Sequence, residues 1–530
     1  MLDTVISNAF IIDGSGRPAY EGALGIKGEK LVMPVADERA KTTIDAEGRH
    51  VCPGFIDAHS HGDMILGTHS AHLFKTTQGI TTEVTGQCGL SIAPVYPLRL
   101  DPLQRLLSFL TPAFPEDMPH WTSFARYLEY ADRQPKTANA LIYAGHCALR
   151  IAVMGEANRP ATGAELDEMK SLLRDAMEHG AAGFSTGLIY APSCYAEKEE
   201  ISELAKVIAP YGGVYATHIR DESKNVAGAV REAIDTGRKA GVKVCISHHK
   251  ISGRANWGLQ SETLGLIEEA RNEGVNVFYD QYPYTRGMTH LNACIPPWHF
   301  NEGYDALTAR LEDRAFRRSL RIEMEDPNTE YSNNYLLSGG WGGVMIVSAA
   351  ATPEAEGKSI VEYAESSGTD PFEAFFDIMA ANRCECSAVY SSMREEDVRE
   401  IAMGPHCIVG TDGCTRSWDE KGHPRASGAF PRAVSLFVKE KGLITLEGMI
   451  RKMTGLTADY LGIKNKGYLR DGYDADVVIF DYDKLKDTST YTNSNSPADG
   501  IDCVFTNGRL VYEDKRLTGV YPGKLLSYNA

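Results

Sequence analysis

Eight apolar runs recur along the chain, and each ends in polar residues suited to catalysis or metal binding. They are VCPGFIDAHSH, ITTEVTGQC, ANALIYAGHC, GAAGFSTGL, GVYATHIRDE, VKVCISHHK, VNVFYDQYPY and HCIVGTDG. Between several of them lie segments with the apolar spacing of helices, at 162–180, 197–212, 225–240 and 259–273. Strands that alternate with helices indicate a parallel sheet, and eight such units predict an α/β fold with a closed (β/α)8 barrel of the TIM type.

The two ends of the chain have a different pattern. Residues 1–53 and 462–530 read as short alternating strands with Gly and Asp turns, so we expect one small, discontinuous β-sandwich domain built from both termini. The barrel would then span 54–461. The segment between the seventh and eighth runs, roughly 288–405, is too long for one crossover, and we expect it to hold a largely helical insertion around 288–350, near the barrel mouth. Extra packing with no role in chemistry is the alternative for this insertion.

Composition excludes several classes of partner. A formal net charge of -17 argues against nucleic acid and anionic membranes, since both reward clustered Lys and Arg. No apolar run approaches membrane-spanning length and no leader pattern opens the sequence, so a cytoplasmic location is expected. The eleven cysteines have no regular spacing and indicate no disulfide framework. A small-molecule substrate fits these limits, and the protein is expected to be a monomer or a small homo-oligomer.

The ends of the eight runs form one ring in such a barrel, because functional residues of this fold lie at the carboxyl ends of its strands. Imidazole, thiolate and carboxylate groups dominate that ring, and zinc takes all three as ligands. In FIDAHSH, His59 and His61 point the same way if the segment is extended, although a lone HxH is equally consistent with one core and one loop histidine. The ring contains His59, His61, Cys88, His146, His218, His248, His249, Lys250, Tyr282 and Asp412.

These motifs carry a family resemblance. FIDAHSH, a His ending the fifth and sixth runs and an Asp ending the eighth are similar to the amidohydrolase superfamily of metal-dependent barrel hydrolases. Within it, GQCGLS, GHCALR, GFSTGLIYAP, THIRDE, SHHK, DQYPYTRG, VGTDG and GHPRASGAFPR together resemble the N-acyl-D-amino-acid deacylases, or D-aminoacylases, over the whole chain. The resemblance implies zinc-dependent hydrolysis of N-acyl-D-amino acids to a carboxylate and a free D-amino acid. The D preference comes from this resemblance alone.

The resemblance also implies a set of metal ligands. Cys88, His218 and His248 would hold a tight zinc ion, and His59, His61 and Asp412 a second, weaker site. Many superfamily members bridge two metals with a carboxylated lysine of strand four, but GFSTGL contains no lysine, which favours the branch that uses a thiolate. Neighbouring strand residues face opposite ways, so only one of His248 and His249 can point inward, and the family match favours His248.

Amide hydrolysis needs an activated water, a polarised carbonyl and a proton for the leaving amine. Metal-bound hydroxide would be the nucleophile, and Asp412 the general base that then hands the proton to the amine. A role for Asp412 as ligand or helix cap alone is the alternative.

Substrate recognition requires cationic groups for a carboxylate. Lys250, Tyr282 and Arg425 match the family's carboxylate-binding positions, and Arg432 is the competitor of Arg425. Tyr190 either lines the pocket or is a packed loop aromatic.

After YPY this chain has TRGMT where small residues are usual in the family. Met288 and Thr289 would therefore line the pocket, with Met288 as a bulkier wall, while Arg286 would add charge near the pocket or face solvent. Residues 291–298 contain no basic residue, which favours apolar amino-acid side chains as substrates.

Three other functions compete with this interpretation. A cyclic-amide hydrolase of dihydropyrimidinase or dihydroorotase type would use the same barrel, but the missing lysine counts against it. A deaminase is possible because activated water serves both reactions. A catalytically inactive scaffold is disfavoured by the intact set of candidate ligands.

Overall fold

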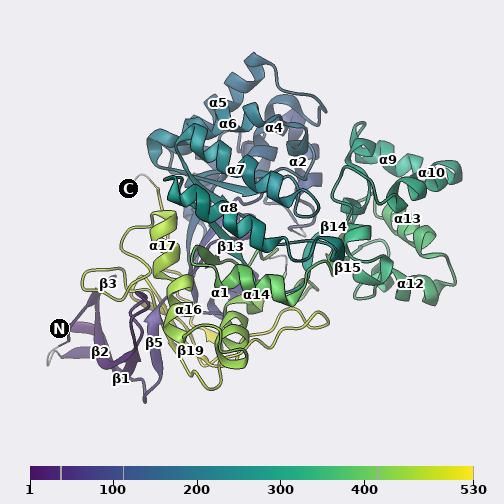
Figure 1. Ribbon diagram of the computed structural model, residues 1–530. Coiled ribbons are helices and arrows are strands. Elements are labelled where there is room, and N and C mark those ends of the chain that lie inside the picture. Colours follow the sequence, from purple (N-terminus) through teal and green to yellow (C-terminus); the bar gives the residue numbers. More distant parts are fainter. Residues whose placement is uncertain (36–38, 112, 415–416, 529–530) are drawn as a thin grey trace.

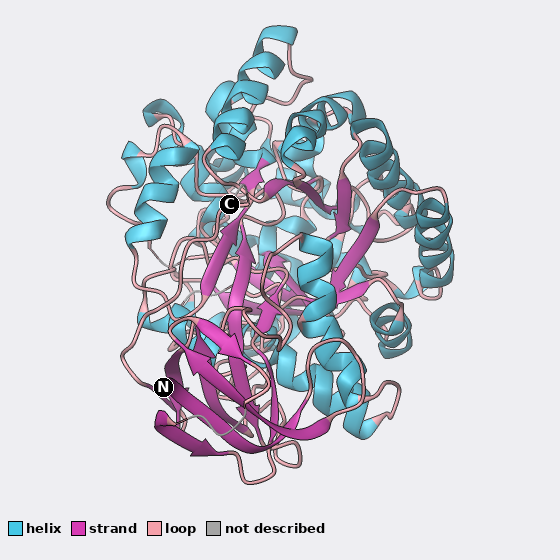
Figure 2. Ribbon diagram, turned by 90° about the vertical axis from the view of Figure 1, so that its left-hand side faces the viewer, coloured by secondary structure: helices cyan, strands magenta, loops and turns pink. Residues whose placement is uncertain are grey.

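Parallel strands form the centre of the molecule (Figures 1 and 2). The computed structural model describes residues 1–35, 39–111, 113–414 and 417–528. Hydrogen bonding gives two ladders in chain order, β6-β7-β8 and β9-β10-β11-β12-β13-β17. Only Tyr143 separates β8 from β9, and a parallel bridge between Ser60 and Gly413 joins the first strand to the last. The strands are β6 (Phe55–Asp57), β7 (Ile80–Thr85), β8 (Asn139–Ile142), β9 (Ala144–Gly145), β10 (Gly183–Gly187), β11 (Val214–His218), β12 (Lys243–Ile246), β13 (Val277–Gln281) and β17 (Cys407–Val409).

Helices connect these strands, which confirms the predicted α/β fold. The four helices expected from apolar spacing are α5 (Gly163–Glu178), α6 (Lys198–Ile208), α7 (Val226–Ala240) and α8 (Gln260–Asn272), and each packs on the next. Thr162 and Glu165 form the capping box that starts α5, as their spacing indicates. The others are α1 (His69–Thr76), α2 (Leu100–Leu107), α3 (Phe124–Arg133), α4 (His146–Met154), α14 (Glu395–Met403), α15 (Arg425–Arg432), α16 (Leu446–Met453) and α17 (Gly455–Leu461). Within the described ranges, none of the helices has the length and apolarity that a membrane crossing requires.

Strands from both ends of the chain share one nine-stranded sheet, which lies at the lower edge of Figure 2 beside the N-terminus. β5 (His50–Pro53) pairs antiparallel with β18 (Val477–Phe480), so the N-terminal and C-terminal strands meet at the middle of the sheet. Apolar side chains from both halves, such as Ile6, Leu24 and Phe505, pack into one cluster. The remaining strands are β1 (Leu2–Ile11), β2 (Tyr20–Lys27), β3 (Lys30–Val32), β4 (Ala40–Asp45), β19 (Ile501–Thr506), β20 (Arg509–Glu513) and β21 (Arg516–Leu517).

The last described residues leave this sheet. Leu525 forms a parallel bridge with Ala140 of β8, and the Gly523 N–H donates to the carbonyl of Lys136. The expected boundary, which assigns everything after 462 to the small domain, therefore needs a correction: the C-terminal segment runs along the parallel strands. The backbone groups of the C-terminal segment form hydrogen bonds there with residues 136–140, at the start of β8.

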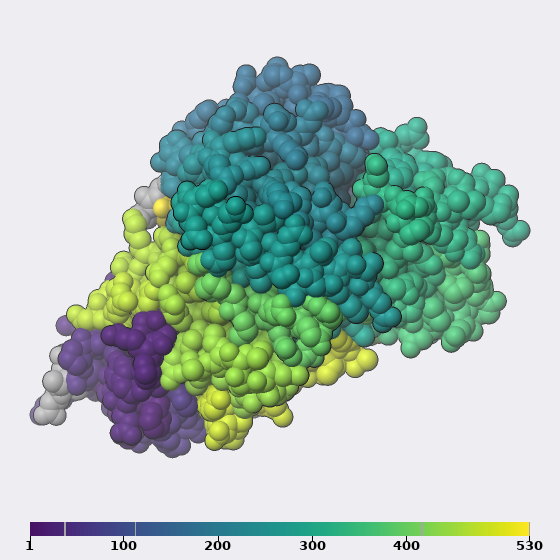
Figure 3. Space-filling view, viewed as in Figure 1, coloured from purple at the N-terminus to yellow at the C-terminus, as the bar shows by residue number. Residues whose placement is uncertain are grey.

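The insertion between β13 and β17 is longer than expected. β14 (Gly287–His290), β16 (Ser387–Tyr390) and β15 (Val344–Ser348) form an antiparallel sheet in that order, so the insertion continues to about 390 instead of ending near 350. A separate apolar cluster holds it together and includes Trp341 and Phe375. It forms a distinct lobe (green, right in Figure 3), and its helices are α9 (Tyr304–Arg310), α10 (Arg314–Glu325), α11 (Asn334–Leu337), α12 (Ile360–Ser367) and α13 (Pro371–Ala381).

Candidate active site

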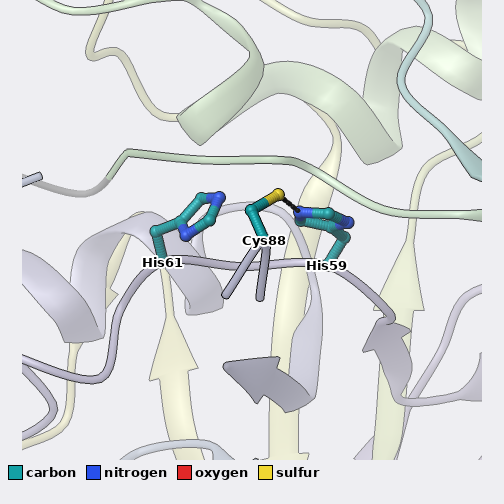
Figure 4. Close-up of side chains that lie close together, drawn as sticks. All are labelled: His59, His61 and Cys88. Atoms are coloured by element: carbon teal, nitrogen blue, oxygen red, sulfur yellow. Dashed lines mark hydrogen bonds between the residues drawn. The ribbon is translucent and has the colours of Figure 1, made fainter. Parts of the chain in front are cut away.

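Six side chains of the types that bind metal ions converge at the carboxyl ends of five parallel strands. All are buried: they follow or end β6, β7, β11, β12 and β17 and are His59, His61, Cys88, His218, His248 and Asp412. Cys88 lies at the centre, with its Sγ 3.3 Å from Nε2 of His59 and 3.3 Å from Nε2 of His248. Figure 4 shows Cys88 between His59 and His61. Three overlapping trios, Cys88–His218–His248, His59–His61–Cys88 and His59–His248–Asp412, have ligand atoms within 4.8 Å of one another.

The backbone at three of these residues is unusual. Cys88, His248 and Asp412 have φ values of 55°, 38° and 48°, in the left-handed region that residues other than glycine rarely adopt. Such conformations cost free energy and concentrate at functional sites. Each lies just beyond a strand, where the left-handed turn directs the side chain across the strand ends. The sequence runs GQCGL, SHHK and GTDG contain no signal for these angles beyond the neighbouring glycines.

Of the two adjacent histidines, only His248 reaches the cluster. The Nε2 atom of His249 lies 2.8 Å from the Thr263 hydroxyl in α8, on the outer side of the strand. His146, another residue of the predicted ring, also lies outside the cluster: its Nε2 is 2.9 Å from Glu200, which is itself paired with Arg150. The buried Glu200–Arg150 ion pair is therefore the partner of His146, which does not contribute to the cluster.

Asp280 of β13 holds two of the histidines. Its Oδ2 lies 3.1 Å from Nδ1 of His59, and its Oδ1 accepts the backbone N–H of His248 at 2.9 Å. Burial alone would lower the pKa of His59, but the Asp280 carboxylate raises that pKa above its usual value. A carboxylate on Nδ1 fixes the tautomer that leaves Nε2 free as a ligand.

His218 has no hydrogen-bond partner for either ring nitrogen within the part of the chain that the structure describes. Burial lowers its pKa to about 4, so the imidazole is neutral at pH 7 and keeps a lone pair for an ion. Orphaned buried polar atoms are rare and require an explanation. An imidazole without a hydrogen-bond partner, 3.6 Å from the Glu222 carboxylate and beside a thiol and a second imidazole, fits the ligand chemistry of zinc.

Glu222 lies beside the cluster on the loop after β11. Its Oε1 is 3.1 Å from Nδ1 of His248 and 2.6 Å from Nζ of Lys250. Nζ of Lys250 also lies 2.7 Å from Nδ1 of His248, and because an ammonium can only donate, Nδ1 accepts from Lys250 while Nε2 is directed at Cys88. The site thus has the Asp280 carboxylate behind His59 and the Lys250–Glu222 ion pair behind His248.

Asp412 faces both the histidines and a cation. Its Oδ1 lies 3.2 Å from Nε2 of His61 and 3.6 Å from Nε2 of His59. Its Oδ2 is 2.7 Å from Nη1 of Arg425. Burial would raise the pKa of Asp412, yet Arg425 and the histidines hold it well below its usual value, so the carboxylate is ionised.

A pocket of about 50 Å³ joins the cluster to the predicted substrate-binding residues. The Arg425 guanidinium lies 4.5 Å from the ring centre of Tyr282, and Nζ of Lys250 lies 5.9 Å from the same ring. Arg432 is directed elsewhere, since it donates to the Pro283 carbonyl at 2.8 Å and pairs with Asp487. The structure therefore brings Arg425, and not its competitor, to the pocket.

Three further predicted residues line the same pocket: Tyr190, Met288 and Thr289. The Tyr190 hydroxyl lies 3.0 Å from Oγ1 of Thr289, and its ring lies edge-on to His218 with centres 5.3 Å apart. Arg286 is not among the lining residues. Its guanidinium lies 4.5 Å from the ring centre of Tyr491, so its charge is stacked outside the pocket.

The comparisons with known proteins agree with this geometry. The model of the amidohydrolase family matches residues 42–512. The D-aminoacylase of Alcaligenes xylosoxydans xylosoxydans is 35% identical over 535 residues, which cover 100% of this chain and 98% of that protein. The chain belongs to the amidohydrolase family, among the N-acyl-D-amino-acid deacylases.

Two solved structures of this family resemble the chain over its whole length. A D-aminoacylase, studied for activation by one metal and attenuation by a second in a binuclear centre, has a TM-score of 0.83 at 34% identity and covers 99% of this chain and 100% of its own. An N-acyl-D-glutamate deacylase of Bordetella bronchiseptica, solved with zinc and a phosphonate mimic of the tetrahedral intermediate, has a TM-score of 0.83 at 32% identity, with 99% of each chain covered.

As a member of the amidohydrolase family, the chain departs from the lysine-bridged members at β10, where Gly183–Gly187 contains no lysine. Sequence reasoning did not single out Asp280, Glu222, Asn334 or Ser392, although all four contact the cluster or line its pocket. For Asp280 a signal existed: it lies two residues before Tyr282 in DQYPY, on the same strand face. Asn334 and Ser392 belong to the insertion and its end, far from any ligand motif.

Proposed function

We propose that this chain hydrolyses the amide bond of N-acyl-D-amino acids and releases a carboxylate and a free D-amino acid. One observation carries the proposal: five of the six candidate ligands, all but His59, line the same pocket as Lys250, Tyr282 and Arg425. An amide beside the ligands would place the carboxylate of an open-chain substrate within reach of a guanidinium, which suits carboxylates. The relatives with this activity in their names support the D series.

We further propose that Cys88, His218 and His248 hold the tighter zinc ion and that His59, His61 and Asp412 form a weaker second site. The ring nitrogens of His218, which have no hydrogen-bond partner among the described residues, and the Asp280 carboxylate behind His59 support this assignment. The binuclear centre described for D-aminoacylase supports two sites of unequal effect. Bound zinc supplies Lewis-acid polarisation of the amide carbonyl and activation of water.

Side chains of the protein bind the substrate and transfer the proton. Arg425, Tyr282 and Lys250 orient the substrate by its carboxylate, and burial excludes competing water from that contact. Asp412 accepts a proton from the attacking water and passes it to the amide nitrogen as the C–N bond breaks, so that the new C–O bond yields the acid and the amine leaves neutral. Its low pKa, imposed by Arg425, keeps it ionised and ready to accept that proton.

We propose that the parallel strands form a (β/α)8 barrel over 54–461, which carries the site at its carboxyl end. The chain-ordered ladders and the Ser60–Gly413 bridge support it. The terminal sheet, wrapped around its own apolar cluster, would be the small β-sandwich domain. The cytoplasmic location and the oligomeric state stay predictions.

The test is release of free amine from paired N-acetyl-D- and N-acetyl-L-amino acids with leucine, methionine, phenylalanine and glutamate side chains. Zinc-loaded and chelated enzyme are compared side by side, with Asp412→Asn as the inactive control. Zinc-dependent turnover of the D series alone is expected. Turnover of dihydropyrimidines but of neither series would replace the proposal with the cyclic-amide alternative.

A further inference from the structure

A second cavity, of about 400 Å³, adjoins the site pocket. Ile189, Tyr190 and Asn334 line both spaces, so the two are neighbours that share these residues as a common wall. One wall is the loop that follows β10, and the opposite wall comes from the insertion, at 290–304 and 330–334. Its volume lies in the range of roughly 300–1,000 Å³ that small-molecule sites occupy. An acetyl group would fill only a small part of it.

The walls of this cavity are mainly apolar and aromatic, and include Leu188, Tyr195, Ile295, Phe300 and Tyr331. Among the described residues that line it, the only Lys or Arg is Arg220. Its guanidinium is already engaged by Glu232 at 2.9 Å and by the carbonyls of Cys194 and Ala196. No cation is therefore available to hold an anionic group, and the carboxylates of Asp221 and Glu330, which also line the cavity, would repel one. The apolar walls suit an uncharged apolar group.

The position of the cavity decides which part of the substrate enters it. In an N-acyl amino acid the carboxylate and the side chain share one carbon, whereas the acyl group begins at the carbonyl carbon. Arg425, Tyr282 and Lys250 line only the smaller pocket. Tyr190 separates the cavity from the site pocket, and its ring lies against the candidate ligand His218. A substrate group that enters the cavity would therefore be the one attached to the carbonyl carbon beside the candidate ligands, and not the one attached to the carbon that carries the carboxylate.

We propose that this larger cavity is an acyl-group subsite and that the enzyme acts on D-amino acids carrying long or aromatic acyl groups in preference to N-acetyl substrates. The inference rests on the proposed deacylase function and adds the acyl class to it. Burial of each further methylene against these walls stabilises the bound substrate, so kcat/KM rises with acyl length until the cavity is filled.

The experiment measures kcat/KM for D-leucine carrying acetyl, butanoyl, octanoyl and phenylacetyl groups. We expect the octanoyl and phenylacetyl substrates to exceed N-acetyl-D-leucine by about tenfold or more. Ala293, which lines only the larger cavity, is replaced in Ala293→Trp to fill it. That variant should lose about tenfold or more on octanoyl-D-leucine while N-acetyl-D-leucine stays within about twofold.

Ala309→Trp is the matched control, because Ala309 is exposed on α9 and lines neither space; it should leave the whole series unchanged. If Ala293→Trp unfolds at a lower temperature than the native protein, Ala293→Leu replaces it in the experiment. The same effect on octanoyl-D-leucine is expected there, but smaller. A flat acyl series in an enzyme that hydrolyses N-acetyl-D-leucine overturns the subsite and leaves the deacylase function intact. A change of amino-acid preference at constant acetyl in Ala293→Trp would make the cavity a side-chain subsite instead. Failure to hydrolyse any D substrate with zinc present overturns the proposed function itself.

Discussion

Nη1 of Arg425 lies 2.7 Å from Oδ2 of Asp412, so the guanidinium assigned to the substrate carboxylate also neutralises the carboxylate assigned to proton transfer. Both side chains are almost completely buried. A buried charge without its partner is costly, so neither group can be changed without affecting the other. The proposed substrate binding and proton transfer would thereby be coupled through one guanidinium.

Arg425→Met should lower kcat/KM on the order of 100-fold, because a buried charge partner and the carboxylate contact are lost together. KM should rise, and kcat should also fall, since the guanidinium no longer positions the Asp412 carboxylate. Steady-state kinetics on the preferred D substrate measure both. Arg432→Met is the control and should leave KM near the native value; the reverse pattern would assign the carboxylate to Arg432.

Asp412→Asn should keep the fold and the zinc of the tight site but lower kcat roughly 100- to 10,000-fold, the usual contribution of general acid–base catalysis. The amide is isosteric with the carboxylate but cannot accept the proton. Zinc content by atomic absorption and turnover are measured on the same sample. Loss of the tightly bound zinc in this variant would show that Asp412 is needed as a metal ligand, and its role as general base would lose support.

Cys88→Ala should abolish tight zinc binding, because Cys88 lies between His59 and His248 and supplies the only thiol of the cluster. Zinc per protein after dialysis against a weak chelator reports the result. Cys503→Ala, a buried cysteine of the terminal sheet, is the matched control and should retain native zinc. Full zinc content in Cys88→Ala would contradict the ligand assignment.

Zinc binding at pH 7 should release about one proton. Burial raises the pKa of the Cys88 thiol well above its usual value, so the metal-free site keeps that proton. Burial lowers the pKa of His218 to about 4 and that of His248 as well, so neither imidazole has a proton to lose. Affinity should therefore increase as the pH rises through neutrality. Calorimetry in two buffers of different ionisation enthalpy counts the protons, and a release of two or more would contradict this protonation state.

Asp280→Asn should weaken zinc binding by roughly 10- to 100-fold. One asparagine oxygen can accept from His59 or from the His248 backbone, but the amide NH₂ cannot accept from the other. Competition with a chromogenic chelator gives the affinity. Asp221→Asn changes an acidic residue that bonds to Ser223 instead and should leave zinc affinity unchanged. Equal affinity in Asp280→Asn and the native protein would make the Asp280 contacts structural only.

The parallel strands and their ends were accessible to sequence reasoning because each run is a short, local apolar signal. Because parallel strands share one direction, the residues at their carboxyl ends, among them His59, Cys88, His218 and Asp412, are predicted to lie in one ring. His146 shows the limit of that argument: its position satisfies the pattern, but Glu200 engages it instead, and a partner far along the chain leaves no local trace.

The insertion was the hardest part to predict. Its strands β14 and β16 are separated by about 100 residues, and short strands of that kind pair through contacts that no local pattern encodes. The helical segments between them dominated the signal, so the expected end near 350 was too early. The same distance hid Asn334 and Ser392, which reach the site pocket from this lobe. The choice of Arg425 over Arg432 depends on which end of one helix faces the site, and α15 had to be positioned to decide it.

The pairing of β5 with β18 has a consequence for biosynthesis. More than 400 residues separate these neighbouring strands, so β5 must keep one edge unpaired until almost the whole chain has been made. At about 5–20 residues per second, that interval is on the order of 20 to 90 seconds, during which an open strand edge can recruit another chain. Nascent protein is therefore expected to depend on chaperone protection of its first strands, whereas the parallel strands can begin to assemble as they emerge from the ribosome.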